Sequence, residues 1–256
     1  MRKSIFYYQE VSSTNDLAKD LAKKGSEEGT MVIAERQTKG RGRFGRTWFS
    51  PEGGIYLSLI LRPQVNPKVI PLITLLAGVA VAEAIKALYA LSVMLKWPND
   101  VLINGKKVSG ILTEMESGIE AINFVIVGIG INANIETRRW FKELDYPATS
   151  LMEELGKRIE IKKLINEVQA KIENFYFLFK QGNYSPILEA YRNLDATFEK
   201  IVEIKTTKEV IKGKAMGIDN YGSLKLKLLT GEKTKVCCGE VISNRLNEGK
   251  SQGFET

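Results

Sequence analysis

Residues 93–112, VMLKWPNDVLINGKKVSGIL, decide the fold class of the chain. The stretch holds three apolar runs and two turn signals, in the order Val93–Trp97, Pro98-Asn99-Asp100, Val101–Ile103, Asn104-Gly105 and Val108–Leu112. Asn-Gly between two apolar runs is the strongest short hairpin signal, because both residues tolerate a positive φ. The stretch therefore predicts three successive antiparallel strands.

Further strands and helices are predicted on both sides of this stretch. Strand patterns occur at residues 4–8, Met31–Ala34, Ile55–Leu61 and Phe124–Ile131. Helical patterns follow the capping residues Ser12–Asn15 as far as Gly25, span Pro67–Leu91, and span Leu164–Lys180 with the apolar stripe Leu164, Val168, Ile172, Phe175 and Phe179. We therefore expect an α+β domain over residues 1–195, with a mixed sheet and helices packed on it.

The pattern changes after about residue 195. Short alternating runs are separated by Gly213, Gly217, Asn220-Tyr221-Gly222 and Gly231, which predicts a small all-β, barrel-like unit over residues 196–256. Its polar end, from about Glu248, is expected to be frayed.

Composition narrows the possible chemistry. The chain has 256 residues, a formal net charge of +7 and no histidine. The absence of histidine excludes serine–histidine and cysteine–histidine nucleophile pairs and histidine-ligated metals. The only cysteines, Cys237 and Cys238, are adjacent, so they predict neither a conventional disulfide nor a zinc site. The positive charge favours a nucleotide, a nucleic acid or an acidic protein as partner.

The location of the protein is predicted from its apolar stretches. Residues 1–10 do not form a secretory signal, because acid interrupts the apolar patch. The most apolar run, Val69–Ala82, is shorter than the roughly 18–20 residues that cross a bilayer, which favours a buried helix. We therefore expect a cytoplasmic protein with no membrane contact.

The loop Gly40–Trp48 is the first candidate binding element. Glycines there let the backbone approach an anion, while Arg41, Arg43 and Arg46 supply guanidinium groups. Trp48 offers a flat surface on which a base could stack. A solvated basic loop and a nucleic-acid patch are the alternatives.

Three other segments carry polar groups or glycine at predicted strand ends. Lys96–Asp100 could rim a pocket or be an ordinary strand exit, and Lys107 could reach over a cleft or face solvent. Gly128-Ile129-Gly130 matches half of a dinucleotide-binding fingerprint, but no helix start follows it. Close passage of a ligand or of another backbone is the better interpretation.

Taken together, these segments resemble one known family. The segments are Ser13-Thr14-Asn15, Gln37, Gly40–Trp48, Lys96–Asp100, Lys107–Leu112 and Val127–Asn132. Their order and spacing, from the first strand to about Arg245, resemble the biotin–protein ligase family. The resemblance implies a class II synthetase-like catalytic domain and an SH3-like C-terminal domain. It also implies formation of biotinyl-adenylate from biotin and ATP with Mg²⁺, then transfer of biotin to a lysine of a carboxyl carrier domain.

The family pattern also implies residue roles. Biotin would be bound by Ser13, Thr14, Asn15, Gln37, Arg41, Gly42, Arg43, Lys107, Gly110, Gly128 and Gly130. ATP would be bound by Arg43, Arg46, Trp48, Asn99, Lys107 and Asn132. Arg43 and Lys107 would be the catalytic residues, and no protein metal site is expected.

Several further expectations follow from the resemblance. Relatives have an arginine four residues after a Gly-Glu pair, whereas here Arg245 lies five residues after Glu240, so whether Arg245 and Glu240 contact ATP is an open question. Regulatory relatives carry an N-terminal DNA-binding winged helix, and the chain begins at the first predicted strand, so no DNA binding is expected. A homodimer is expected from family behaviour. Loop 40–48 is expected to be mobile without ligand and to close over the adenylate.

Three alternatives remain at this stage. A lipoate or octanoate attachment enzyme would share the fold, and competition between biotin and lipoate would separate the two. A nucleic-acid-binding protein would show a steep salt dependence, although aromatic residues are not interleaved with the basic ones. A scaffold without activity is disfavoured by the clustering of glycine, arginine and lysine.

Overall fold

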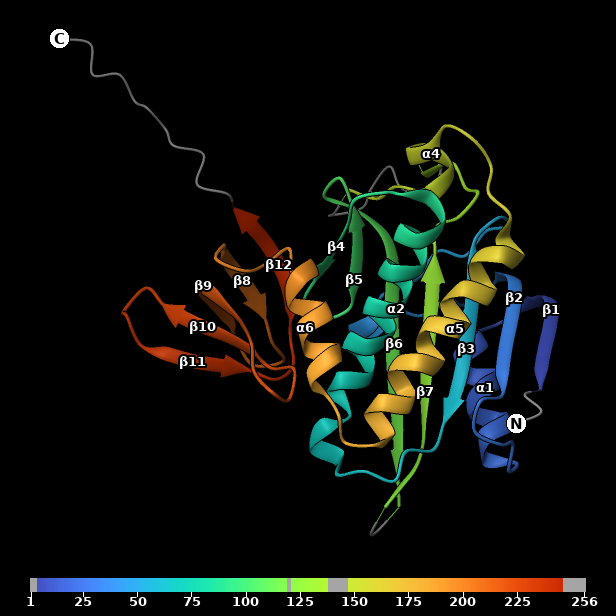
Figure 1. The fold of residues 1–256 in the computed structure, drawn as a ribbon, viewed down its shortest axis with the longest axis horizontal. Helices are drawn as coiled ribbons and strands as arrows, with labels where there is room; N and C mark the ends of the chain where they lie inside the picture. The colour runs from blue at the N-terminus through green and yellow to red at the C-terminus, as the bar shows by residue number, and fades with distance from the viewer. Residues whose placement is uncertain (1–3, 119–120, 138–146, 246–256) are drawn as a thin grey trace.

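The computed structural model describes residues 4–118, 121–137 and 147–245. A seven-stranded sheet and a five-stranded sheet lie beside each other, with most of the helices on the larger one (Figure 1). This arrangement confirms the predicted α+β class with a mixed sheet and a separate C-terminal β unit.

The larger sheet has the order β1-β2-β3-β7-β6-β5-β4. Its strands are β1 (Ile5–Val11), β2 (Met31–Gln37), β3 (Ile55–Leu61), β4 (Val93–Lys96), β5 (Asp100–Ile103), β6 (Lys106–Ser117) and β7 (Ile122–Ile131). Only β1 and β2 are parallel among these pairs. The mostly antiparallel sheet rules out the doubly wound architecture that a dinucleotide fingerprint requires.

Both predicted turns of the 93–112 stretch are present. Lys96 pairs with Asp100 across the first turn, between β4 and β5. Asn104 and Gly105 form the second turn with φ of 51° and 74°, which are the positive values that this hairpin type requires. The second hairpin pairs Lys107 with Leu102, two residues from Asp100, so the side chains of Asp100 and Lys107 come into contact.

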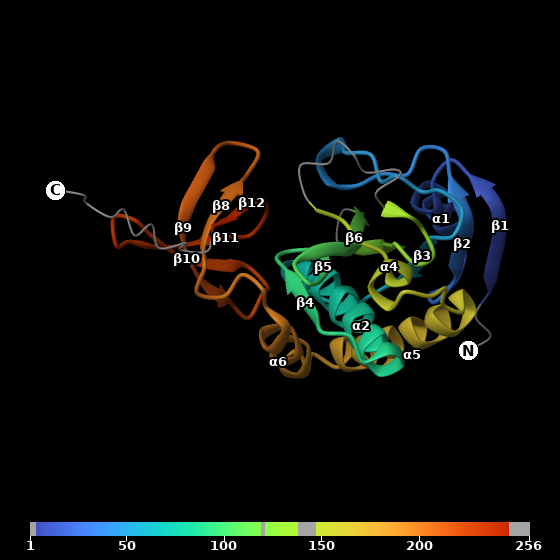
Figure 2. The same ribbon diagram turned by 90° about the horizontal axis from the view of Figure 1, so that it is seen from above.

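The helices are α1 (Thr14–Lys23), α2 (Pro71–Tyr89), α4 (Leu151–Leu155), α5 (Ile161–Lys180) and α6 (Ser185–Leu194), with short 3₁₀ turns η1 (Arg43–Gly45) and η2 (Pro67–Val69). Helices α2, α5 and α6 lie on one side of the larger sheet, and α1 lies on the other (Figure 2). Sequence patterns had not indicated α4 or α6.

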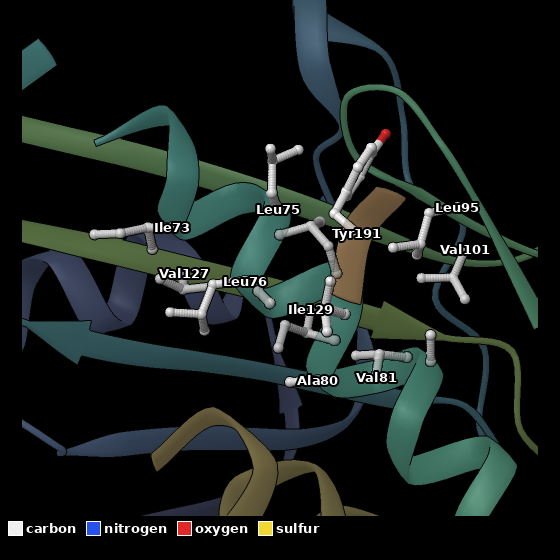
Figure 3. Close-up of a cluster of buried hydrophobic side chains, with 14 of the residues drawn as sticks. Ile73, Leu75, Leu76, Ala80, Val81, Leu95, Val101, Val127, Ile129 and Tyr191 are labelled. Atoms are coloured by element: carbon white, nitrogen blue, oxygen red, sulfur yellow. The ribbon is translucent and has the colours of Figure 1, made fainter. Parts of the chain in front are cut away.

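Helix α2 forms the centre of the core. Its side chains pack between the sheet and the outer helices, and Figure 3 shows Leu76 and Ala80 beside Val127 and Ile129 of β7. The segment Pro67–Tyr89 is 23 residues long with a mean hydropathy of 1.9, enough to cross a membrane by length and composition. The apolar segment is therefore longer than the predicted run Val69–Ala82. However, 78% of its most apolar 18-residue stretch is buried within the fold, as expected of a core helix.

The smaller sheet has the order β11-β10-β9-β8-β12 and is antiparallel throughout. Its strands are β8 (Ile201–Lys205), β9 (Val210–Ile218), β10 (Leu224–Leu228), β11 (Lys233–Val236) and β12 (Glu240–Arg245). The predicted frayed end from Glu248 lies outside the described residues.

Hydrogen bonds join the end of β4 to the C-terminal unit and to the segment that leads into it. The amide of Ala196 donates to the carbonyl of Leu95 at 2.8 Å. The indole Nε1 of the buried Trp97 donates to the carbonyl of Gly222 at 2.9 Å, and Lys96 Nζ donates to the carbonyl of Val241 at 3.3 Å. The end of β4 therefore forms a seam between the two units.

Candidate active site

A pocket of about 220 Å³ opens on the α1 side of the larger sheet. Alternation along β7 explains its position. Val127 and Ile129 point into the core under α2, whereas Phe124 and Ile126 point to the other face and pack under α1. The next two residues of β7 on this second face are Gly128 and Gly130. Asn15 and Trp48 occupy the space that side chains at these two positions would fill, so both can lie against the strand at the floor of the pocket.

Every residue for which the sequence predicted a binding or catalytic role lines this pocket. They are Ser13, Thr14, Asn15, Gln37, Arg41, Gly42, Arg43, Arg46, Trp48, Asn99, Lys107, Gly110, Gly128, Gly130 and Asn132. The structure brings them together, but it does not assign each of them to biotin or to ATP.

A buried hydrogen-bond network fixes the end of the pocket beside α1. The amide and hydroxyl of Thr14 donate to Gln37 Oε1 at 2.8 and 3.1 Å. Ser58 Oγ lies 2.6 Å from Asn15 Oδ1, and Asn15 Nδ2 donates to Glu114 Oε2 at 2.7 Å. The side chain of Ser13 caps α1 by accepting from the amide of Asp16. This end offers uncharged donors and acceptors of fixed orientation.

Trp48 lies against two facing glycines of the sheet. Gly110 and Gly130 are register partners in β6 and β7. A Cβ at Gly130 would lie 2.4 Å from Trp48 Nε1, and one at Gly110 would lie 2.9 Å from Trp48 Cζ3. Lys107 Nζ lies 5.3 Å from the centre of the same ring system. The glycines are therefore required for the position of the indole.

The cations of the 40–48 loop are held by partners within the protein. Arg41 contacts both Asp16 and Glu114. Arg43 donates to the carbonyl of Gly239 at 2.8 Å and to Asn99 Oδ1 at 3.3 Å, and Arg46 pairs with Glu240. An incoming anion must therefore compete with these contacts, which the sequence alone does not show.

Two lysines flank a buried carboxylate at the other side of the pocket. Lys107 Nζ lies 2.6 Å from Asp100 Oδ1, and Lys96 Nζ lies 3.5 Å from Asp100 Oδ2. Burial lowers the pKa of Lys96, and Asp100 opposes that effect by favouring the ammonium form. The trio carries an excess positive charge beside the pocket.

Two buried polar atoms of the pocket residues have no partner within the described residues. They are Trp48 Nε1, a donor, and Asn132 Oδ1, an acceptor, while Asn132 Nδ2 donates to the carbonyl of Thr149. An unpaired buried polar group costs free energy, so such atoms commonly mark places that a ligand or a water satisfies. A heterocycle with both donors and acceptors would fit them.

Sequence reasoning gave no role to several other pocket residues. These are Thr47, Phe49, Ile111, Leu112, Ile129 and Ala148, and Glu240 was considered only as an open question. The partners Asp16 and Glu114 were also missed. The side chain of Arg245 lies outside the part of the structure that is described, so its relation to the pocket stays open.

The arrangement suits the joining of two anions. The pocket combines a neutral, hydrogen-bonding end with four cations, Arg41, Arg43, Arg46 and Lys107. Two carboxylate or phosphate groups brought to about 4 Å repel by roughly 4 kcal/mol at an effective dielectric of about 20. Cations placed around both groups can offset that cost. Among the described residues no group of three His, Cys, Asp or Glu side chains could hold a metal.

Comparison with known protein families gives two matches. The sequence model of the "Biotin/lipoate A/B protein ligase family" matches residues 7–132, and that of the "Biotin protein ligase C terminal domain" matches residues 197–242.

Relatives and solved structures agree with these matches. The "Bifunctional ligase/repressor BirA" of Bacillus spizizenii is 39% identical over 234 residues, which cover 91% of this chain and 72% of that protein. The "Biotin--[acetyl-CoA-carboxylase] ligase" of Mycobacterium tuberculosis is 34% identical over 254 residues, which cover 92% of this chain and 87% of that protein. The biotin protein ligase of Aquifex aeolicus, solved in complex with biotin and ATP, superposes with a TM-score of 0.79 at 32% identity, covering 93% of this chain and 97% of that one.

Proposed function

Because the chain belongs to the biotin protein ligase family, we infer that the described pocket binds biotin and ATP and forms biotinyl-5′-AMP. The enzyme then transfers biotin to a lysine of a biotin-dependent carboxylase. We place that lysine on the biotin carboxyl carrier domain. The relatives' names favour this activity over lipoate or octanoate attachment, and over a nucleic-acid-binding or scaffold protein without activity.

The observation that carries this function is the pairing of a neutral pocket end with a ring of cations. We assign the neutral end, formed by Ser13, Thr14, Asn15 and Gln37, to the uncharged head group of biotin. The floor at Gly128 and Gly130 belongs to the same ligand. The carboxylate of biotin then points toward Arg41, Arg43 and Lys107, which is the direction from which a phosphate must approach.

The nucleotide occupies the remaining part of the pocket. Trp48 and Asn132 face the base, since each has an unpaired buried polar atom. Arg46 and Asn99 hold the rest of the nucleotide. Each binding cation must exchange an internal partner for a phosphate or carboxylate oxygen, so Glu240 and Gly239 release the loop as ATP enters.

Adenylate formation needs no proton transfer from the protein. The carboxylate oxygen of biotin attacks the α-phosphorus, and the bond to the β-phosphate breaks with loss of pyrophosphate. Arg43 and Lys107 stabilise the charge that develops on the phosphoryl oxygens. Magnesium would be supplied as the ATP complex, where it would offset part of the phosphate charge. In the described part of the chain, no group of three His, Cys, Asp or Glu side chains could hold it independently of ATP.

Transfer requires the acceptor lysine to lose a proton, since its ordinary pKa is about 10.4. Asp100 is the proposed acceptor of that proton, because its carboxylate lines the pocket 2.6 Å from Lys107. The neutral amine attacks the carbonyl carbon of the mixed anhydride, and AMP leaves. Closure of loop 40–48 would keep water from the anhydride.

We further propose a cytoplasmic homodimer. The edge strand β1, with the exposed Phe6 and Tyr7, offers a surface for a second copy.

Incubation with radiolabelled pyrophosphate, ATP, Mg²⁺ and biotin tests the activity. Biotin-dependent exchange of label into ATP is the expected result. Exchange that needs lipoate instead of biotin, or no exchange with either acid, would contradict the proposal. Protease cleavage of loop 40–48 should fall when biotin and ATP are added together. Equal cleavage with and without ligands would exclude closure of the loop.

A further inference from the structure

One face of the C-terminal sheet carries a cluster of lysines. Alternation places Ala215, Leu224 and Leu226 inside the unit and turns their neighbours outward. The outward side chains include five lysines across β9, β10 and β11, here called the lysine face. They are Lys214, Lys225, Lys227, Lys233 and Lys235.

These lysines lie directly opposite one another. The register pairs Lys225 with Lys235, and it pairs Lys227 with both Lys214 and Lys233. Like charges directly opposite on neighbouring strands destabilise a sheet. The arrangement is therefore unfavourable for the isolated protein, and a bound anion would remove that cost.

Carboxylates neutralise only part of the lysine face. Lys214 lies 3.6 Å from Glu199, and Lys235 lies 3.1 Å from Asp219. No ion pair within residues 4–118, 121–137 and 147–245 joins Lys225, Lys227 or Lys233 to a carboxylate. The excess positive charge is thus concentrated on the β10–β11 hairpin.

The hairpin is close to the pocket along the chain. Glu240 lines the pocket and follows Lys235 by five residues, a span of at most about 18 Å. The β10–β11 hairpin extends away from the larger sheet (Figure 1). A macromolecule that inserts a side chain into the pocket would therefore be within reach of this hairpin.

We propose that the lysine face is the docking surface for an acidic flank of the carrier protein that presents the acceptor lysine. This inference rests on the proposed function, which requires a folded protein at the pocket mouth. Opposite charges would raise the rate of encounter and orient the carrier before its lysine enters the pocket. Single-stranded nucleic acid fits less well, because the outward positions of β9, β10 and β11 carry no aromatic residue for base stacking.

The test variant is Lys225→Gln/Lys227→Gln/Lys233→Gln. Its matched control is Lys157→Gln/Lys162→Gln/Lys163→Gln, which removes the same charge from exposed positions at and before α5, outside the pocket. Biotin transfer to a purified carrier domain is measured against carrier concentration at about 50 mM and about 500 mM NaCl. Biotin-dependent pyrophosphate exchange is measured without carrier.

For the test variant we expect kcat/KM toward the carrier to fall by roughly tenfold at low salt, mainly through KM, and by less than about twofold at high salt. Pyrophosphate exchange should equal that of the wild type, and the control variant should match the wild type in both assays. The test variant should also unfold at the same or a higher temperature, because lysine repulsion is removed.

Three outcomes would overturn the docking surface. They are an unchanged KM for the carrier at low salt, an equal loss in the control variant, or duplex DNA binding that the test variant alone loses while carrier KM stays constant. Failure of the wild-type enzyme to exchange pyrophosphate would instead count against the proposed function, so the two failures are distinguishable.

Discussion

Gly130→Ala should disrupt the pocket through the position of one side chain. The new Cβ would lie 2.4 Å from Trp48 Nε1 and 2.5 Å from Trp48 Cε2. Ordinary contacts begin near 3.4 Å, so the indole must move by about 1 Å from the strand. Gly110 and Lys107 border the same ring, which limits how it can yield.

The size of the effect follows from this crowding. Overpacking a filled site by one methyl group typically costs about 1–3 kcal/mol. Each 1.4 kcal/mol corresponds to a factor of ten, so we expect the combined affinity for biotin and ATP to weaken by roughly 5-fold to 150-fold. Gly130 is not among the positive-φ residues, so the strand itself should accept alanine without backbone strain.

Pyrophosphate exchange at varied biotin and ATP concentrations measures this loss, together with the melting temperature of each variant. Gly78→Ala in α2 is the matched control, because the new Cβ would meet only Leu95 Cδ2 of β4, at an ordinary contact distance of 3.6 Å. The control should keep full exchange and gain up to about 1 kcal/mol of stability. Exchange by Gly130→Ala within twofold of wild type would show that the indole is not held against this strand during turnover.

Four other substitutions, the first with a matched control, test three proposed roles and one effect on stability. Lys107→Gln should slow adenylate formation by about 10²–10³-fold. The control Lys106→Gln removes only a pair with Glu154 and should leave the rate unchanged. Equal rates for the two variants would exclude a role for Lys107. Arg43→Gly should release biotinyl-adenylate and label bystander proteins, detected by streptavidin blotting, because the link of the loop to Gly239 is lost; labelling confined to the carrier would refute this. Asp100→Asn should slow single-turnover transfer, and a rate equal to wild type across pH would exclude Asp100 as the base. Burial raises the pKa of Asp195 despite hydrogen bonds from Thr197, so its stabilising effect is present below about pH 4 and lost as pH rises through the folded-state pKa. Asp195→Asn should therefore melt above wild type at pH 7, with the difference shrinking toward pH 4, and a constant difference across pH would contradict that origin.

Much of the fold was predictable because local signals agreed with the tertiary structure. Asn104-Gly105 specifies its hairpin through φ values that few other residues adopt. In contrast, the part of β6 after Leu112, as far as Ser117, was not predicted, because polar residues such as Glu114 interrupt the apolar pattern there. Helix α6 was missed although Ser185-Pro186 marks its start, since ten residues give only a short periodic pattern.

The binding residues were predictable as a set, whereas their partners were not. Glycine and arginine at fixed spacing identify the loop, since the chemistry of anion binding requires those residue types. The carboxylates that hold the loop have no local signal. Arg46 and Glu240 are 194 residues apart in the sequence, so only the folded chain reveals that the C-terminal unit contacts the loop.

The seam at the end of β4 limits how this protein can be recombined with its relatives. Removing the chain from residue 196 onward would strip the buried indole of Trp97 and the buried ammonium of Lys96 of their carbonyl acceptors at Gly222 and Val241. The net loss would be about 1 kcal/mol for the hydrogen bond of Trp97 and about 1.5–3 kcal/mol for that of the charged Lys96, whose contact with Asp100 would remain. A chimera made by exchanging C-terminal units would consequently need its junction chosen inside one sheet or the other, with both sides of the seam inherited from a single parent.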